Sequence, residues 1–128
     1  MILDSSAVVS VLLREPGHEE LESKMREAGL LAIGAPTLVE TRTVMVRRYG
    51  APGLKEVDRF FTGLATTVIP FDGDHAEVAG EASVRFGKGR HPAKLNYGDC
   101  MTYATARIAD EPLLFIGDDF AQTDIQAA

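Results

Sequence analysis

The sequence has a single cysteine, and it lacks the segments that direct a chain into or across a membrane. Cys100 is the only cysteine among 128 residues, so no disulfide can form within the chain. A lone cysteine is typical of a reducing compartment. The first residues, Met1 to Asp4, carry no cluster of positive charge and no long apolar run, so they predict neither a signal peptide nor a membrane span. We therefore expect a cytoplasmic protein with no membrane partner.

Basic residues are also few, and the glycine-rich loops that bind nucleotide phosphates are missing. Lys and Arg total 13 against 19 Asp and Glu, which gives a net charge of −6. This balance disfavours a nonspecific nucleic-acid binder. It does not exclude a nuclease, because carboxylates gathered at a metal site count as negative until bound divalent ions offset them. No Walker-type loop and no Rossmann fingerprint is present.

The length and composition are those of one globular domain, spanning residues 1–128. Hydrophobic residues make up 45% and charged residues 25% of the chain, as in an ordinary folded protein. Short apolar runs typical of buried strands alternate with longer segments of helical periodicity. The predicted strands are 1–3, 30–33, 66–70 and 113–116, and the predicted helices are 7–14, 18–28, 36–49, 54–64, 75–86 and 97–109. This alternation predicts a three-layer α/β/α fold with a central parallel sheet.

Acidic residues follow strands or begin helices at several separate places in this pattern. The residues concerned are Asp4 after the first strand, Glu40 and Asp99 near the starts of two helices, and Asp118 and Asp119 after the last strand. In a parallel sheet all of these positions lie at one edge, where ligands bind. Clustered carboxylates raise one another's pKa unless cations are present. Hard oxygen ligands select Mg²⁺, with Mn²⁺ as an alternative, and such ions can activate water and stabilise the leaving oxygen of a phosphodiester.

Each acid also has a structural explanation. These are a helix cap for Asp4, a partly exposed position or an ion pair with Arg47 or Arg48 for Glu40, a partner of the helix dipole for Asp99, and a turn for Asp118 and Asp119. Asp99 lies in the first turn of the predicted helix 97–109, where the dipole favours a charged carboxylate, so we expect it to stay ionised easily. Ser5 or Ser6 is expected to cap the helix 7–14.

Several stretches of the chain together resemble the PIN-domain family, specifically its VapC-type ribonuclease toxins of type II toxin–antitoxin pairs. The resemblance is carried by Ile-Leu-Asp-Ser-Ser-Ala at 2–7, Leu-Val-Glu-Thr at 38–41, Gly-Lys-Gly-Arg-His at 87–91, Leu-Asn-Tyr-Gly-Asp-Cys at 95–100 and Leu-Leu-Phe-Ile-Gly-Asp-Asp-Phe at 113–120 with Thr-Asp-Ile at 123–125. It spans essentially the whole chain and keeps the family's order and spacing.

The resemblance implies a Mg²⁺-dependent endoribonuclease with RNA as its substrate. Asp4 and Asp99 are the implied metal ligands, and Glu40 with Asp118 or Asp119 would complete the catalytic pocket. Ser6 matches a hydroxyl that orients Asp4. The fourth acid departs from the Thr-x-Asp or Thr-x-Asn pattern of many relatives, and we favour Asp119 because Phe120 would anchor it. The resemblance further implies a homodimer and a cognate antitoxin that covers the acidic pocket.

A basic loop precedes Asp99, and its cations are candidates for binding RNA. Lys88, Arg90 and Lys94 lie between residues 87 and 94 and are predicted to hold phosphates beside the metal ions, although a solvated loop is the alternative. His91 is a weaker candidate for proton transfer, because a two-metal mechanism needs no such group. Tyr97 flanks the acids and could stack on a base.

Other functions were weighed against this one. A catalytically silent PIN-like module that binds RNA or a protein is the main alternative, and the intact acids argue against it. A receiver-type phosphoacceptor would need an acid pair after the first strand and a late lysine, which are missing. Cys100 follows Asp99 into an apolar helix with no histidine placed to activate it, so we expect it to lie in the core.

Overall fold

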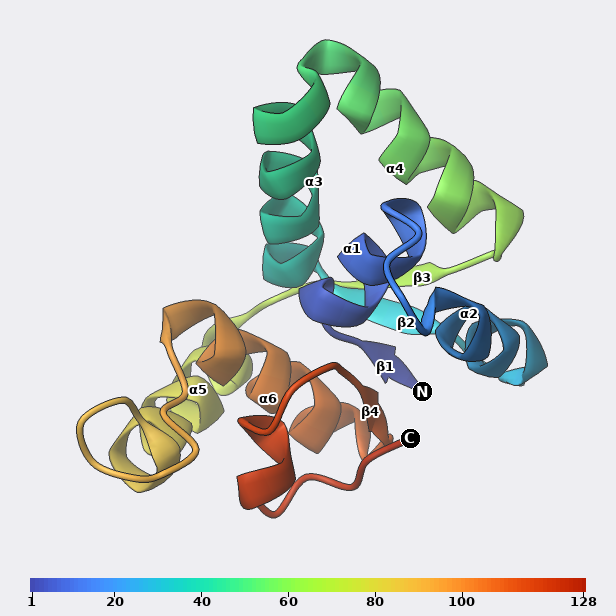
Figure 1. Cartoon of the computed structure of the whole chain (residues 1–128). Coiled ribbons are helices and arrows are strands. Elements are labelled where there is room, and N and C mark those ends of the chain that lie inside the picture. The colour runs from blue at the N-terminus through green and yellow to red at the C-terminus, as the bar shows by residue number, and fades with distance from the viewer.

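The fold is organised around a small sheet whose four strands are all parallel. The computed structural model describes residues 1–128. The strands are β1 (Ile2–Leu3), β2 (Ala32–Gly34), β3 (Thr67–Ile69) and β4 (Leu113–Leu114), and they lie in the order β3-β2-β1-β4. β1 is central, with Ile2 opposite Ala32 on one side and Leu113 on the other. The predicted parallel sheet is confirmed (Figure 1).

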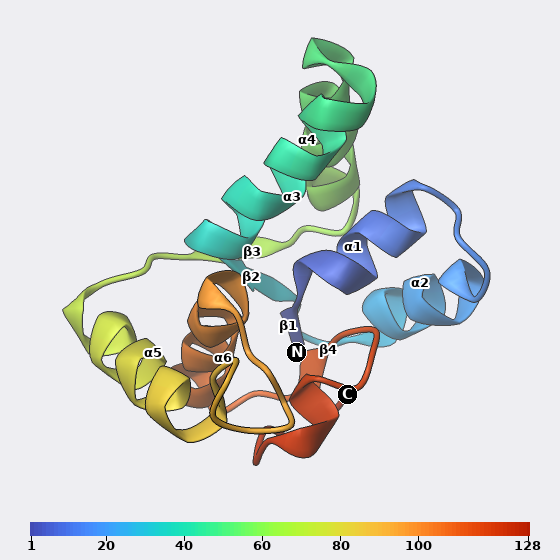
Figure 2. The ribbon, with the colours of Figure 1, turned by 60° about the vertical axis from the view of Figure 1, so that its left-hand side comes forward.

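Six α-helices cover the two faces of the sheet. They are α1 (Ser5–Leu12), α2 (His18–Glu27), α3 (Ala35–Tyr49), α4 (Ala51–Gly63), α5 (Gly73–Phe86) and α6 (Tyr97–Ala109), followed by the short 3-10 helix η1 (Phe120–Gln122). α1 to α4 lie on one side, whereas α5 and α6 lie on the other (Figures 1 and 2). The predicted three-layer α/β/α architecture is therefore confirmed. None of these helices combines the length and the apolar character that a bilayer crossing requires.

Neighbouring residues of β1 and of β4 contribute to two separate cores. Ile2 packs with α5 and α6, whereas Leu3 packs with α1 to α4. Leu113 and Leu114 divide in the same way, as expected when successive side chains of a strand point to opposite faces. Every residue of β1, β2 and β4 is buried, whereas β3 at the edge of the sheet is largely exposed.

A row of small and hydroxylated residues joins α3 to α6 across the end of the sheet. The hydroxyls of Thr37 and Thr102 are hydrogen-bonded at 2.8 Å and are both buried. Gly34 allows the close approach, since a Cβ atom there would lie 2.6 Å from Oγ1 of Thr105. This tight contact fixes the first turns of α3 against α6.

The ends of several elements differ from those predicted. α1 begins at Ser5 rather than residue 7, because Asp4 is its cap and accepts a hydrogen bond from the Ser6 N–H. The expectation that Ser5 or Ser6 caps this helix is therefore wrong. α4 begins at Ala51, since Pro52 is accommodated in its first turn. β4 ends at Leu114, where a loop toward Asp118 and Asp119 begins.

Candidate active site

The candidate site lies at the carboxyl ends of β1 and β4, where the strand order reverses. From β1 the chain proceeds through β2 to β3 on one side, and it returns to the other side only with β4. Such a reversal opens a crevice beyond the carboxyl ends of the strands. Asp4 follows β1, Asp119 lies beyond β4, and Glu40 and Asp99 lie near the starts of α3 and α6. We call these four residues the acidic edge.

Asp4 is buried, and one of its carboxylate oxygens is fully engaged. Oδ2 accepts hydrogen bonds from the N–H and the hydroxyl of Ser6, whereas Oδ1 has no partner. The Ser6 oxygen in turn accepts the N–H of Ile116 at 3.0 Å. Ser6 therefore connects Asp4 to the loop after β4, which is the position predicted for a residue that orients Asp4. Asp4 is thus a helix cap with a second oxygen left free.

Asp99 is held in the same manner at the start of α6. The Asn96 N–H donates to Oδ2 of Asp99, and the Asp99 N–H donates to Oδ1 of Asn96, both at 2.9 Å. This reciprocal capping box leaves Oδ1 of Asp99 without a partner. Asp4 and Asp99 therefore each present one fixed oxygen and one free oxygen.

The surroundings of Asp99 oppose its ionisation. Burial raises the pKa of this carboxyl, and the charges of Asp4 and Asp119 raise the pKa further, against the lowering effect of the hydrogen bond from Asn96. The expectation that the helix dipole keeps Asp99 easily ionised is therefore wrong. Desolvation and like charge cause this rise in the pKa of Asp99.

Glu40 approaches the same helix from α3. A Cβ atom on Gly98 would lie 3.3 Å from both carboxylate oxygens of Glu40, so the glycine makes room for this side chain. Burial raises the pKa of Glu40, the Ser5 hydroxyl opposes that shift, and the charges of Asp4 and Asp99 add to it. Neither Arg47 nor Arg48 forms an ion pair, so the ion-pair explanation for Glu40 is wrong, whereas the alternative of a partly exposed position is confirmed.

Asp118 and Asp119 are both exposed, but only the charge of Asp119 affects the pKa of Asp99. The charge of Asp119 contributes to the raised pKa of Asp99, whereas Asp118 does not contribute. Phe120 is 3% exposed and contacts Phe115, with ring centroids 5.3 Å apart, so it anchors the segment that carries Asp119. The structure therefore brings Asp119 to the acidic edge, and its catalytic role stays a prediction.

The acidic edge has the donors that a hard divalent cation prefers. No cation of the chain pairs with any of its four carboxylates. As they stand, no three His, Cys, Asp or Glu side chains are close enough together to hold one ion. The free oxygens of Asp4 and Asp99 nevertheless fit Mg²⁺ in their chemistry.

The basic loop forms a rim beside the start of α6. Lys88, Arg90 and Lys94 surround a cavity of about 510 Å³ together with neighbouring backbone, and none of them forms an ion pair. His91 accepts the Ala93 N–H through Nδ1 and meets Phe86 edge-on, so it holds the loop in shape. The loop projects next to α6 in Figure 2.

The sequence did not assign a role at the acidic edge to Ser5, Asn96 or Gly98. Asn96 could have been found, since an Asn three residues before an acid predicts a capping box. The roles of Ser5 and Gly98 could not be predicted from neighbouring residues. Ser5 forms a hydrogen bond with Glu40 and Gly98 leaves room for its carboxylate, and Glu40 is distant from both in sequence. Cys100 is buried, and burial with the nearby Asp99 charge raises the pKa of its thiol, which disfavours a nucleophile.

Comparisons with known proteins give a consistent result over nearly the whole chain. The PIN domain model matches residues 1–126. A ribonuclease VapC of Mycolicibacterium smegmatis is 39% identical over 127 residues, covering 99% of this chain and 98% of the relative. Ribonuclease VapC42 of Mycobacterium tuberculosis is 40% identical over 129 residues, covering 100% and 98%.

Solved structures support the same fold. VapC20 of M. tuberculosis, a toxin that cleaves the sarcin–ricin loop, has a TM-score of 0.80 at 17% identity and covers 99% of this chain and 97% of its own. VapBC2 from Rickettsia felis, bound to a DNA fragment from its promoter, has a TM-score of 0.77 at 15% identity, with 98% and 94% covered.

Proposed function

Because the chain belongs to the PIN-domain family and its relatives are VapC ribonucleases, we propose that it is a Mg²⁺-dependent endoribonuclease and the toxin of a type II toxin–antitoxin pair. The observation that carries the proposal is the acidic edge, where carboxylates from separate elements influence one another's pKa and none of them is paired with a cation of the chain. A bound Mg²⁺ would supply an activated water and stabilisation of the leaving oxygen. Mn²⁺ is an alternative ion.

The residues of the chain have distinct tasks in this proposal. Asp4 and Asp99 hold the ion through their free oxygens, and Ser6 and Asn96 orient these two carboxylates. Glu40 and Asp119 add negative charge from two further sides. The unpaired cations of Lys88, Arg90 and Lys94 bind phosphates of the RNA next to the reacting bond.

The partners follow from the relatives. A toxin–antitoxin complex from Klebsiella pneumoniae is among the similar structures. We propose a cognate antitoxin that covers the acidic edge, a homodimeric toxin, and action in the cytoplasm. A catalytically silent PIN-like module is the second candidate, and one observation favours it: no three acids converge on one point.

The experiment is an RNA cleavage assay with purified protein in Mg²⁺ and in EDTA. Asp4→Asn and Asp99→Asn are each expected to lower the rate by at least roughly 10²–10³-fold, since each removes negative charge from the metal site. Asp110→Asn is the matched control, because it lies at the opposite end of α6 in a left-handed conformation that Asn tolerates. Cleavage that persists in EDTA or in both site variants would contradict the proposal.

A further inference from the structure

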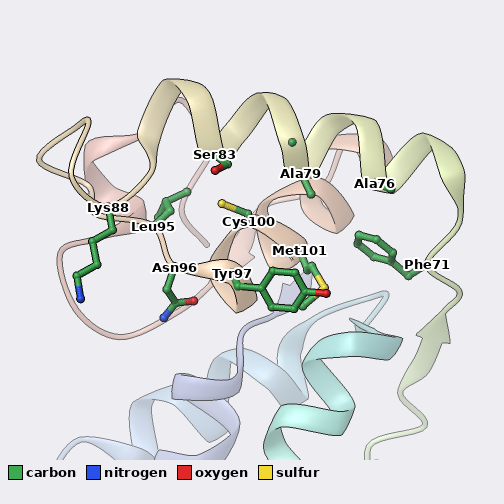
Figure 3. A pocket seen from close by; sticks show the side chains of 11 residues that line it. Phe71, Ala76, Ala79, Ser83, Lys88, Leu95, Asn96, Tyr97, Cys100 and Met101 are labelled. Carbon is green, nitrogen blue, oxygen red and sulfur yellow. The ribbon is translucent and has the colours of Figure 1, made fainter.

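A cavity between α5 and α6 borders the acidic edge and has no role in the mechanism described so far. It measures about 620 Å³ and is lined mainly by hydrophobic residues. Figure 3 shows Phe71 at one end, Lys88 at the other, and Tyr97 beside Met101 along its open side. This volume lies within the range of roughly 300–1,000 Å³ that holds a small organic group.

Tyr97 is the most exposed large apolar side chain of the molecule. It is 83% exposed, its hydroxyl makes no hydrogen bond, and its ring contacts no other aromatic ring. Nothing in the fold requires an aromatic residue at the first position of α6. The exposed ring borders a mainly apolar cavity, so the two together form one apolar surface that is open to a ligand.

The position of Tyr97 connects the cavity to the carboxylates. Tyr97 and Met101 line the large cavity and also a smaller one of about 260 Å³ that contains Glu40. Asn96 lines the large cavity as well, and it holds Asp99 through the capping box. A group bound in the large cavity therefore lies directly beside the acidic edge.

The polar groups at the mouth identify the chemistry of the occupant. The side-chain amide nitrogen of Asn96 makes no hydrogen bond, and Lys88 forms no ion pair and continues into the cationic rim of the loop. An apolar slot with a stacking ring, an amide donor and an adjoining row of cations fits a nucleobase attached to a phosphate chain. A base within a duplex cannot enter, because both of its faces are already stacked.

We propose that this cavity receives one unpaired base of the RNA, stacked on Tyr97, and so positions the neighbouring phosphodiester at the acidic edge. The inference rests on the proposed ribonuclease function and adds a specificity-determining site to it. It restricts the substrate to single-stranded segments, such as loops, at the point of cleavage.

The test uses a short single-stranded RNA with one central 2-aminopurine, whose fluorescence falls when the base stacks. Binding is measured in EDTA, so that no cleavage occurs. Tyr97→Phe is expected to keep the quenching and the affinity, whereas Tyr97→Ala is expected to lose the quenching and to bind roughly 5- to 150-fold more weakly, the usual range for one stacked base.

A second variant fills the cavity from the opposite wall. Gly80 lines it, and a Cβ atom there meets nothing within 4 Å, so Gly80→Leu is chosen to narrow the cavity. It is expected to lower affinity as Tyr97→Ala does, with Gly80→Ala as the control that gains the same helix propensity without filling the space. In a duplex the base is already stacked, so the same RNA is expected to show no further fall in fluorescence when the protein is added.

The outcomes separate this inference from the proposed function. Metal-dependent cleavage without any quenching by the unmodified protein would overturn the base site and leave the ribonuclease proposal standing. Quenching without cleavage in any metal would support the base site and contradict the ribonuclease. If Tyr97→Ala and Gly80→Leu leave RNA affinity unchanged but dissociate a dimer in light scattering, the cavity belongs to a second copy of the chain and the base site is wrong.

Discussion

The acidic edge and the carboxylate of Asp124 show two opposite ways in which this fold treats negative charge. Asp124 accepts a hydrogen bond from the Tyr103 hydroxyl at 2.7 Å and pairs with Arg85 at 3.0 Å. The hydrogen bond from Tyr103 and the nearby Arg85 lower the pKa of Asp124. At the acidic edge, burial and like charges raise the pKa of Glu40 and of Asp99.

The difference lies in what the chain supplies to each carboxylate. Asp124 receives a donor and a cation, so its charge is balanced within the protein and contributes to stability. Asp4 and Asp99 receive donors that fix one oxygen each, but no cation. A carboxylate that serves only the fold would be expected to resemble Asp124, and the unpaired carboxylates of the acidic edge are consistent with the proposed Mg²⁺ site.

The largest effect that would sharpen this comparison is expected at the fourth acid. Asp119→Asn should lower RNA cleavage roughly 10²-fold or more, because it removes one of the four negative charges of the proposed metal site. Asp118→Asn should leave the rate within about threefold, since the charge of Asp118 does not affect Asp99. Both residues are exposed, so both variants should fold, which circular dichroism can verify. If only Asp118→Asn lost activity, Asp118 and not Asp119 would be the fourth acid of the acidic edge.

A smaller loss is expected when Asp4 is no longer oriented. Ser6→Ala removes the hydroxyl that joins Asp4 to the Ile116 N–H, and residues that orient metal ligands typically contribute 10- to 100-fold, so we expect a loss of about that size. The concentration of Mg²⁺ needed for half-maximal activity should rise, while Ser6→Thr retains a hydroxyl and restores part of the rate. An unchanged Mg²⁺ requirement in Ser6→Ala would show that Ser6 serves only the fold.

On the other side of the comparison, Asp124→Ala is expected to affect stability and not the chemical step. It leaves the buried Tyr103 without its acceptor, which should cost about 1–2 kcal/mol in urea unfolding. The control is Glu56→Ala, which removes an exposed ion pair with Arg59 and should cost less than about 1 kcal/mol. The rate per folded molecule should match the parent in both.

The smallest expected effect has the opposite sign. Glu40→Gln removes a charge that the metal-free fold disfavours, so it should raise the unfolding temperature slightly at neutral pH. The corresponding gain in the free energy of unfolding should be no more than about 1 kcal/mol. Added Mg²⁺ should stabilise the parent more than the variant. A lower unfolding temperature in Glu40→Gln without metal would contradict the raised pKa.

The two regions should also respond oppositely to pH. The folded state holds protons on Glu40 and Asp99 at pH values where the unfolded chain has lost them, so stability from these groups falls as pH rises from their ordinary pKa through the raised folded pKa. Asp124 contributes stability above its ordinary pKa, and this contribution is lost as pH falls through its lowered folded pKa. Unfolding curves of Glu40→Gln and Asp124→Ala between about pH 3 and pH 7 should separate these terms.

Much of the fold could be predicted from local patterns. The helix Tyr97–Ala109 was predicted with the bounds that the structure gives, since the helical pattern begins beside Asn96 and stops before Asp110. The acids Asp4 and Asp99 could be expected at one edge because parallel strands impose that geometry. Strand ends were harder, since Phe115 and Ile116 continue an apolar run beyond the two residues of β4 that pair.

The electrostatics of the site could not be predicted in the same way. The sequence places Asp99 at a helix start, but the pKa depends on burial and on Asp4 and Asp119, which are far away in the chain. The choice between Asp118 and Asp119 likewise depends on how the loop after β4 is anchored by Phe120. The contributions of Ser5 and Gly98 to Glu40 exist only once α1, α3 and α6 have packed together.

The central place of β1 bears on when the site comes into existence during synthesis. β1 is made first and β4 last, and the Ser6 oxygen that holds Asp4 depends on the N–H of Ile116, 110 residues later. A nascent chain without β4 lacks Asp119 and this bond, so the acidic edge stays incomplete until β4 and the loop after it have been synthesised. Contacts of such long range also form slowly. The order in which the ribosome delivers the strands therefore delays completion of the acidic edge.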